Sequence, residues 1–343
     1  MTSIESATVL ISTIIPTIGR PSLSTAIQSV LDQGLSQNDF EIIVVNDSGR
    51  PLPEADWQKS GRIKVIDTHR RNRSVARNVG AAASRGKYLH FLDDDDWMMP
   101  GAFEALLTLA ESSGAAWTHG AFRMVDNAGT MVTELHPDET GNCSIQMLAW
   151  EWLPLQASLI RSDAFFAVDG FASLPSLGGG FEDVHLSRQV SLYNDMARTE
   201  NIVTAIRIGD VSSTTNYVTM FDQNRISREK SMSARQAFRR LIDSARSNPS
   251  RSNYWFGKVI YYYMASAKWH LQEKQLLTAT SRGIYTLVGF LLARSRLFSS
   301  DFWRGVIRPH YPRMGTAIQE AGADHLYANT RSAIDLSTTK SRR

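Results

Sequence analysis

Residues 88–100 have the sequence YLHFLDDDDWMMP, in which a short apolar run leads into four consecutive aspartates, Asp93 to Asp96. The apolar run predicts a buried strand, and the aspartates follow its carboxyl end. Four carboxylates between apolar flanks would repel one another strongly unless a cation lay among them. Because the ligands would all be oxygen atoms, the stretch favours Mg²⁺ or Mn²⁺. A solvated acidic loop is the alternative, whereas the glycine and final glutamate of a calcium-binding helix-loop-helix are missing.

On both sides of this stretch, up to about residue 210, short runs rich in β-branched residues alternate with helical patterns. Such alternation is typical of a mostly parallel sheet covered by helices. The predicted strands are 9–15, 41–45, 63–66, 88–92, 155–160 and 202–206. The predicted helices between them include 23–31, 75–83 and 103–109, each from apolar side chains at helical spacing. We therefore expect an α/β fold with a mixed, mostly parallel sheet flanked by helices.

The pattern changes near residue 218, after which it is helical. The predicted helices in this part are 233–245, 254–270 and 276–292. We predict a first domain over residues 1–218 and a basic, aromatic-rich helical region over 219–331. The polar segment 332–343 is predicted to be a disordered tail, because it has too little apolar surface to bury.

Charge divides at the same boundary. Residues 1–218 hold 16 cations and 26 anions, whereas residues 219–343 hold 21 cations and 8 anions, so the overall net charge of +3 conceals two opposite halves. An acidic region with clustered carboxylates suits cations, and a basic region is attracted to anionic lipid or nucleic acid. A merely solvated basic helical surface is the alternative for the second half.

Length and composition indicate an ordinary globular protein of about two domains, with 343 residues, 43% of them apolar and 21% charged. The single cysteine, Cys143, excludes an internal disulfide and argues against a thiolate zinc site. The N-terminus lacks the cations of a signal peptide. The longest apolar stretch, 283–293, is about half the length that a spanning helix requires. We expect a cytoplasmic protein with no transmembrane helix.

Polar and flexible residues also follow the other predicted strands. In open α/β sheets, ligands bind beyond the carboxyl ends of the strands. The residues at these ends, or on the helix after the third strand, are Pro16, Thr17, Ile18, Arg20, Asp47 and Arg77. They combine a carboxylate that can accept from a base N–H with a cation suited to phosphate. A nucleoside diphosphate fits this inventory, although neither a G-x-G-x-x-G fingerprint nor a P-loop is present.

Ordered motifs extend over about residues 8–210. They are Ile14-Ile15-Pro16-Thr17 with Arg20, then Ser29 to Gln33, Ile42 to Ser48, Ala76 to Gly80, Gly86-Lys87-Tyr88, Phe91 to Asp96, Gly170-Phe171 and Gly180 to Asp183. In order and spacing this succession resembles family 2 glycosyltransferases, which have the GT-A fold. The basic helical region lies outside the resemblance.

The resemblance implies a role for each matching residue in binding a nucleotide sugar. Pro16, Thr17 and Ile18 would border the nucleoside, with Arg20 at the same strand end, Asp47 would accept a hydrogen bond from the base, and Arg77 would lie near the diphosphate. In the D-x-D motif, Asp93 would approach the ribose, Asp94 is the middle residue, and Asp95 would bind the metal directly. Asn46 and Ile18-Gly19 depart from the family's usual residues, which leaves the identity of the base open.

Glu182 and Asp183 follow a run of three glycines, Gly178 to Gly180, which would let the backbone approach a ligand. The resemblance implies that Asp183 is the general base, taking the proton of an acceptor hydroxyl. Without the preceding motifs, the pair would be interpreted as the acidic first turn of a helix. Glu182 and Trp152 are further candidates on the acceptor side, although Trp152 could equally pack in the core.

The resemblance therefore predicts a metal-dependent inverting glycosyltransferase that uses Mn²⁺ or Mg²⁺. A nucleotide diphosphate sugar would be the donor, and a glycan, a lipid-linked molecule or a small molecule the acceptor. Two alternatives are a non-catalytic sugar-nucleotide-binding module and a sugar-phosphate nucleotidyltransferase. The second normally needs a Gly-rich basic loop after the first strand, and residues 16–20 match such a loop poorly.

The aromatic and cationic residues of the C-terminal part allow two interpretations. The aromatic residues are Trp255, Phe256, Tyr261, Tyr262, Tyr263 and Trp269, and cations such as Lys258, Lys268, Arg282, Arg294 and Arg296 are interleaved with them or follow them. On amphipathic helices they would suit a peripheral contact with anionic lipid at the inner face of the membrane. Alternatively, the aromatics pack the helices onto the first domain or a second subunit. No nucleic-acid partner is predicted, because the recognition signatures are missing, and the oligomeric state stays open.

Overall fold

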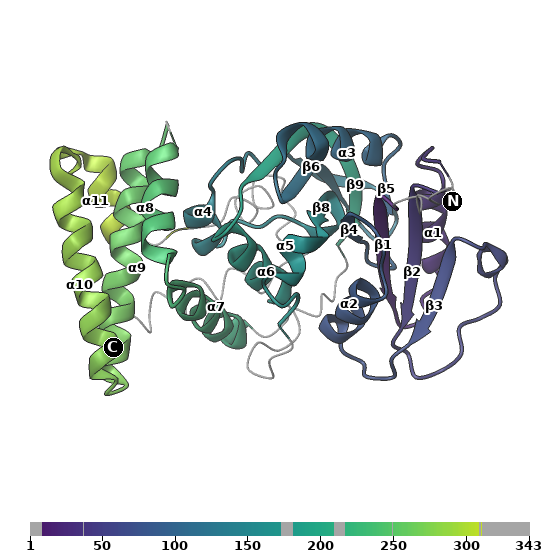
Figure 1. The fold of residues 1–343 in the computed structure, drawn as a ribbon, viewed down its shortest axis with the longest axis horizontal. Coiled ribbons are helices and arrows are strands. Elements are labelled where there is room, and N and C mark those ends of the chain that lie inside the picture. The colour runs from purple at the N-terminus through teal and green to yellow at the C-terminus, as the bar shows by residue number, and fades with distance from the viewer. Residues whose placement is uncertain are drawn as a thin grey trace, which may run out of the picture.

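The computed structural model describes residues 9–36, 38–172, 181–208, 217–248, 250–308 and 310. The predicted glycine hinge, Gly178 to Gly180, and the predicted tail, 332–343, lie outside the described residues. Figure 1 shows an elongated molecule with a sheet and its covering helices at one end and a group of long helices at the other.

A mixed sheet forms the first part of the molecule, as the sequence predicted. Its strands are β1 (Ile11–Thr17), β2 (Phe40–Asn46), β3 (Ile63–Asp67), β4 (Tyr88–Phe91), β5 (Trp97–Met98), β6 (Trp117–Val125), β7 (Met131–Leu135), β8 (Ser158–Arg161) and β9 (Met196–Arg207). Their order is β3-β2-β1-β4-β8-β6-β9-β5, and β7 pairs with β6. The first four strands are parallel, whereas β8 is antiparallel to both of its neighbours. The carboxyl ends of β1, β2 and β4 therefore meet at one edge.

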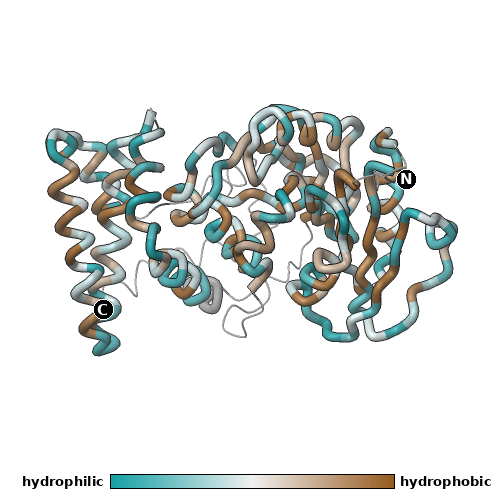
Figure 2. The backbone as a smooth tube through the Cα atoms, in the orientation of Figure 1, coloured by the Kyte–Doolittle hydropathy of each residue, from teal (hydrophilic) through white to brown (hydrophobic). Residues whose placement is uncertain are grey.

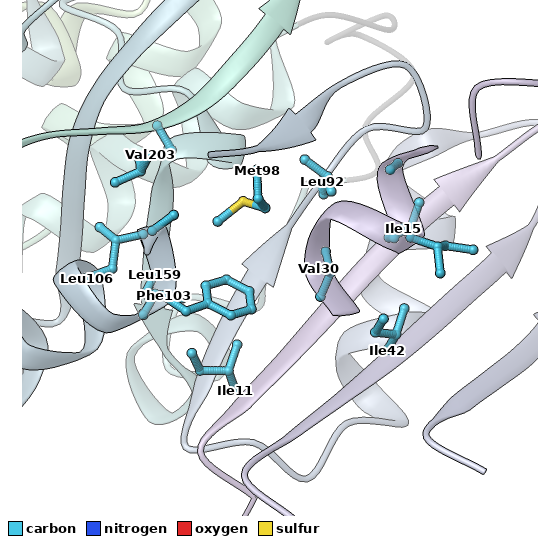
Figure 3. Close-up of a cluster of buried hydrophobic side chains, with 14 of the residues drawn as sticks. Ile11, Ile15, Val30, Ile42, Leu92, Met98, Phe103, Leu106, Leu159 and Val203 are labelled. Atoms are coloured by element: carbon cyan, nitrogen blue, oxygen red, sulfur yellow. The ribbon is translucent and has the colours of Figure 1, made fainter. Parts of the chain in front are cut away.

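Helices cover both faces of this sheet. They are α1 (Leu23–Leu31), α2 (Arg73–Ala82), α3 (Ala102–Ser113), α4 (Ser144–Leu148), α5 (Ser162–Phe166) and α6 (Glu182–Ser191), with 3-10 turns η1 (Asp56–Lys59) and η2 (Leu155–Ala157). On one face, Val30 of α1 and Phe103 of α3 pack with Ile11 and Ile15 (Figure 3). On the other face, α2, α5 and α6 pack around Ile14 and its neighbours. Alternate residues of β1 thus serve two separate cores.

Close packing of α2 against β1 explains a glycine inside that helix. A Cβ added at Gly80 would clash with Ile14 Cγ2 and lie 3.1 Å from Val45 Cγ2. The helix can approach the sheet this closely only because Gly80 has no side chain. This approach fixes the position of Arg77, one turn earlier on the same helix.

The described residues after 217 are helical, as expected. The helices are α7 (Tyr217–Met232), α8 (Ala237–Ser247), α9 (Ser252–Gln272), α10 (Leu276–Ala293) and α11 (Ser300–Ile307), with a 3-10 turn η4 (Arg294–Phe298). Trp255, Phe256, Tyr262 and Tyr263 are buried in a core that also contains Ile145 of α4. Of the two interpretations of these aromatics, packing is the one the structure supports. The helical region is joined to the sheet region through α4.

Three differences from the sequence-based expectations stand out. The strand predicted over 155–160 begins only at Ser158, because η2 forms first and Ala157 N donates to Pro154 O at 3.1 Å. Strands β6 and β7 were not predicted. One helix, α10 continued by η4 over Leu276–Phe298, is long and apolar enough to cross a membrane by length and composition, although the sequence had led us to expect none.

Candidate functional site

The four aspartates form a turn between β4 and β5, with Asp96 N donating to Asp93 O at 3.2 Å. Their side chains alternate in environment. Asp94 and Asp96 are buried, whereas the side chains of Asp93 and Asp95 are 31% and 35% exposed. The two more exposed carboxylates are those that the D-x-D resemblance assigned to ribose and metal.

Two arginines relieve most of the repulsion between these carboxylates. Arg20 forms an ion pair with Asp94 and lies 3.4 Å from Asp95, and Arg77 Nη2 lies 2.7 Å from Asp93 Oδ1. Burial would raise the pKa of Asp93, but Arg77 holds it below its ordinary value. Guanidinium groups therefore supply part of the positive charge that the aspartates need, and the metal ion stays a prediction.

Negative charge nevertheless remains in excess at Asp95 and Asp96. Burial, and then the neighbouring Asp93 carboxylate, raise the pKa of Asp95. The same two causes raise the pKa of Asp96 well above its ordinary value. Such shifts mark a site that would gain from a further positive charge. In the part of the chain that the structure describes, no three acidic, histidine or cysteine side chains converge as a complete metal site.

The end of β1 lies against this turn. Thr17 Oγ1 donates to Asp94 Oδ2 at 2.5 Å and accepts from Gly19 N at 2.9 Å. Pro16 is half-buried and Ile18 is exposed. The residues predicted to border the nucleoside and the acidic turn therefore lie at the same edge of the sheet. Asp94, the middle residue of the predicted D-x-D motif, is buried and contacts Thr17 and Arg20.

Asp47, at the end of β2, holds the loop before α2. Its Oδ1 accepts from Thr68 Oγ1 and from the N–H groups of Arg70 and Arg71, each at 2.7 Å. Its Oδ2 accepts from Asn72 N. A carboxylate offers about four acceptor positions, two on each oxygen. Recognition of a base by Asp47 stays a prediction, and Oδ2 is the oxygen with acceptor capacity left for it.

Arg77 links the acidic turn to the start of α6. Its Nη1 donates to Glu182 Oε1 at 3.0 Å while Nη2 donates to Asp93, and both carboxylates raise its pKa against the opposing effect of burial. Arg73 Nε lies 3.3 Å from the same Glu182 oxygen. The Arg77 side chain is 5% exposed. Arg77 therefore holds two distant segments together instead of pointing into solvent, and its predicted contact with a diphosphate stays untested.

Asp183, in the first turn of α6, is held by two donors. Its Oδ1 accepts from Val184 N at 2.7 Å, and its Oδ2 accepts from Trp152 Nε1 at 2.9 Å. Burial and the adjacent Glu182 raise the pKa of Asp183, and Trp152 and Arg77 partly oppose this increase. Trp152 is half-buried, with its ring edge-on to Phe122 at 5.8 Å between centroids. Trp152 thus belongs to the site through a contact with Asp183 that the sequence did not predict.

Two residues that contact the acidic turn were not predicted from the sequence. Gln156 Nε2 donates to Asp93 Oδ2 at 2.9 Å and to Asp96 Oδ2 at 3.0 Å. Arg207 N, at the end of β9, donates to Asp96 Oδ1 at 2.7 Å. Gln156 and Ser158 are the polar residues in the otherwise apolar run 153–160, and the amide at position 156 was the available signal. The Arg207 side chain also reaches the turn, where its Nε donates to Asp95 O at 3.3 Å. Both contacts join segments more than 100 residues apart, so no local pattern indicated them.

Comparisons with known proteins agree with this geometry. The family model described as Glycosyl transferase family 2 matches residues 12–156. An uncharacterized glycosyltransferase of Haemophilus influenzae is 29% identical over 169 residues, which are 48% of this chain and 57% of that protein. The poly(ribitol-phosphate) beta-N-acetylglucosaminyltransferase TarP of Staphylococcus aureus is 32% identical over 111 residues, covering 31% of this chain and 34% of TarP. The chain thus spans less than two thirds of these relatives.

A search of solved structures shows the same fold. The crystal structure of S. aureus TarS 1-349 in complex with UDP-GlcNAc superposes with a TM-score of 0.52 at 13% sequence identity. The match covers 80% of this chain and 90% of the TarS chain. At this identity the likeness concerns the fold, and it agrees with a GT-A arrangement of the sheet and its helices.

Proposed function

We propose that this chain, which matches the glycosyl transferase family 2 model over residues 12–156, transfers a sugar from a nucleoside diphosphate donor to an acceptor hydroxyl. The observation that carries this proposal is the double ion pair of Arg77. It joins Asp93 to Glu182, which lies 105 residues after Arg77 in the chain, and so brings Asp183 towards the acidic turn. A base and a diphosphate-binding edge side by side are what sugar transfer requires.

The reaction is a single displacement at the anomeric carbon. The acceptor oxygen attacks this carbon, its proton passes to the Asp183 carboxylate, and the bond from the carbon to the diphosphate breaks. The bonding electrons leave with the nucleoside diphosphate. Because the acceptor oxygen displaces the diphosphate in one step from the opposite side, the anomeric configuration inverts. A raised pKa suits Asp183 to this role, because a more basic carboxylate is a better proton acceptor near neutral pH.

We infer that this site takes one divalent cation. Asp95 is the carboxylate that would hold Mn²⁺ or Mg²⁺, because it is partly exposed and its raised pKa reflects uncompensated negative charge. When bound, such an ion supplies positive charge that stabilises the departing diphosphate. Arg20, which lies 3.4 Å from Asp95, would have to give up part of this contact.

The relatives suggest which substrates to test first. TarS was crystallised with UDP-GlcNAc, and the name of TarP describes transfer of N-acetylglucosamine to poly(ribitol-phosphate). We therefore propose a UDP-linked N-acetylhexosamine as the first donor. The acceptor is a glycan, a lipid-linked glycan or a small hydroxyl compound, and polyol-phosphate glycans are the first class to screen.

Turnover and donor binding can be separated with one variant. Purified chain is incubated with UDP-GlcNAc and Mn²⁺, with and without acceptors, and released UDP is measured. Asp183→Asn should lower release by about 10²- to 10⁴-fold, because positioned proton transfer contributes that much to rate. Donor affinity, measured by calorimetry, should stay close to that of the wild type. Asp56→Asn, at an exposed position on η1, is the matched control and should leave both values unchanged.

The same assay addresses the two alternatives. A chain that binds UDP-sugars with Mn²⁺ but releases no UDP with any acceptor would be a binding module. Formation of pyrophosphate from a nucleoside triphosphate and a sugar phosphate would identify a nucleotidyltransferase. Binding of no nucleotide sugar across a panel of bases and sugars would contradict the proposal itself.

A further inference from the structure

Helix α10 carries a row of apolar side chains on the side that faces away from the rest of the described molecule. Leu277, Ile284, Leu287 and Leu291 are between 54% and 90% exposed. Their spacing of seven, three and four residues places them on one face of the helix. Phe298, in η4, extends the row and is 93% exposed. We call these five residues the α10 face.

The α10 face lies at the edge of the molecule. Figure 1 places α10 at the end opposite to the sheet, and Figure 2 shows it as a helix with several strongly hydrophobic turns. Monomeric proteins rarely expose a continuous apolar row of this kind unless it meets a partner.

Cations border the α10 face at both ends. Exposed Lys274 precedes it in the sequence, exposed Arg294 lies between Leu291 and Phe298, and exposed Arg308 follows it. The sequence contains no acidic residue between positions 274 and 300. The nearest acids are Glu273 and Asp301, and Asp301 is paired with Arg304 at 2.9 Å. An apolar row bordered by cations matches the interface of an anionic lipid bilayer, where side chains meet acyl chains and headgroups together.

The inward side of α10 argues against crossing a bilayer, despite the helix's length. Arg282, near its middle, is buried and donates from Nη1 to Met232 O at 2.7 Å and from Nη2 to Ser233 Oγ at 3.0 Å. Gly289 lets the helix approach Ile260 of α9, where a Cβ would lie 2.9 Å from Cγ1. A spanning orientation would strip α10 from these partners and expose a guanidinium to hydrocarbon. At a membrane, the helix would therefore lie parallel to the bilayer plane instead of crossing it.

Charge also argues against a second copy of this chain as the partner. A dimer formed through the α10 face would bring together two copies of residues 219–343, a segment whose sequence carries 21 cations and 8 anions. Like charges at such an interface oppose association, whereas an anionic surface attracts both regions. We propose that the α10 face docks this protein on the surface of anionic membranes, with the apolar row inserted at the headgroup boundary. The proposal goes beyond sugar transfer and does not depend on it.

Vesicle flotation with the full chain tests this proposal. The vesicles are pure phosphatidylcholine or phosphatidylcholine mixed with phosphatidylglycerol. We expect flotation with the mixed vesicles, less with the pure ones, and a decrease as salt is raised. The double variant Leu287→Gln, Leu291→Gln should reduce binding at least about tenfold, because two large apolar groups no longer leave water. Its control, Val65→Gln with Met131→Gln, changes exposed apolar residues of the sheet region and should float like the wild type.

Several results would overturn the proposal. They are equal recovery of the wild type with both vesicle types, no flotation at all, or unchanged flotation of the α10 variant. A concentration-dependent dimer in the absence of vesicles, lost in the α10 variant, would assign the face to a second copy instead. Donor affinity of the same samples is measured in parallel, so a failure of docking is distinguishable from a failure of the proposed function.

Discussion

The two regions of this molecule depart in opposite ways from the rule that charged side chains are exposed and large apolar side chains are buried. The sheet region buries charges, among them Arg77, Asp94 and Glu182, whereas the helical region exposes large apolar residues such as Leu277 and Leu291. Buried charges are costly unless they are paired, and exposed apolar rows are unfavourable unless a partner covers them. In each region, the proposed function lies where the region departs from the rule.

The two regions also differ in whether the protein itself supplies a partner for these unusual side chains. In the sheet region the protein supplies the partners itself, since Arg77 contacts both Asp93 and Glu182. In the helical region, among the described residues, Leu287 and Leu291 stay exposed. A variant in the first region should therefore change stability and chemistry together, and a variant of the α10 face should change neither.

The largest expected effect comes from removing the buried cation of the sheet region. Arg77→Met keeps an unbranched chain in place of the aliphatic part of arginine but removes the guanidinium that the Asp93 and Glu182 carboxylates share. Breaking a buried pair in this way costs about 3–5 kcal/mol. Denaturant unfolding at neutral pH should show this loss, and UDP release should fall with it. The loss should be smaller at acid pH, where the stranded carboxylates can take up protons.

Lys59→Met is the control for this experiment, because Lys59 and Asp56 form an exposed ion pair at 2.7 Å. Removing that pair should leave the free energy of unfolding nearly unchanged. A loss of less than about 1 kcal/mol in Arg77→Met would mean that the carboxylates find water or other donors, and the linking role of Arg77 would be wrong.

Much of the sheet region could be predicted because its physics is local. Strands β1, β2 and β4 are apolar runs with sharp ends, and parallel pairing brings those ends together whatever the rest of the chain does. The meeting of Thr17, Asp47 and Asp93 at one edge follows from that rule. Strand β6, by contrast, contains Thr118, His119 and Gly120 and is buried on both faces, so it shows neither alternation nor a continuous apolar run.

The parts of the site that escaped prediction depend on contacts between distant segments. The bond from Trp152 to Asp183 and the ion pair of Arg77 with Glu182 join residues 31 and 105 positions apart. No spacing rule relates such pairs. The environment of the α9 aromatics could not be predicted for the same reason. The sequence pattern around Trp255 and Tyr263 would be the same whether these side chains contacted lipid or a protein core. Only the packing of α8, α9 and α11 decides between these two environments.

Two glycines allow a matched comparison of packing in the two regions. Gly257→Ala would place a Cβ against the carbonyl oxygen of Phe302, where α9 and α11 cross, and Gly80→Ala would place one against the Ile14 side chain. Both should destabilise the fold by about 1–3 kcal/mol, the usual cost of overpacking. Gly257→Ala should be the more destabilising of the two, because the backbone oxygen of Phe302 can move away less easily than the side chain of Ile14.

Donor binding should separate these two variants. Gly80 lies on the helix that carries Arg77, so Gly80→Ala should weaken affinity for the nucleotide sugar, whereas Gly257→Ala should leave it unchanged. Gly283→Ala is the control, because nothing lies within 4 Å of a Cβ there and helix propensity favours alanine. Loss of donor affinity in Gly257→Ala would show that the helical region shapes the donor site.

A smaller change is expected from the hydrogen bond between Trp152 and Asp183. This bond stabilises the charged carboxylate, so Trp152→Phe should raise the pKa of Asp183 further above its ordinary value. Because the base must be deprotonated to act, the acidic limb of the pH–rate profile should move to higher pH. The profile of kcat/KM measures this in the free enzyme. A shift to lower pH, or none, would exclude Trp152 as a positioning residue for the base.

The smallest effect is expected at the α10 face in the absence of lipid. Leu287→Gln replaces a side chain that is 65% exposed and should change the free energy of unfolding by no more than about 0.5 kcal/mol. Ile260→Ala, in the buried core beneath the same helix, should cost about 2–5 kcal/mol in the same denaturant titration. We expect this contrast if no part of the protein covers the α10 face, because making a side chain polar changes the free energy of unfolding little when that side chain is already in water. A loss comparable to that of Ile260→Ala would mean that the chain itself covers Leu287, and the membrane would then have no apolar row to meet.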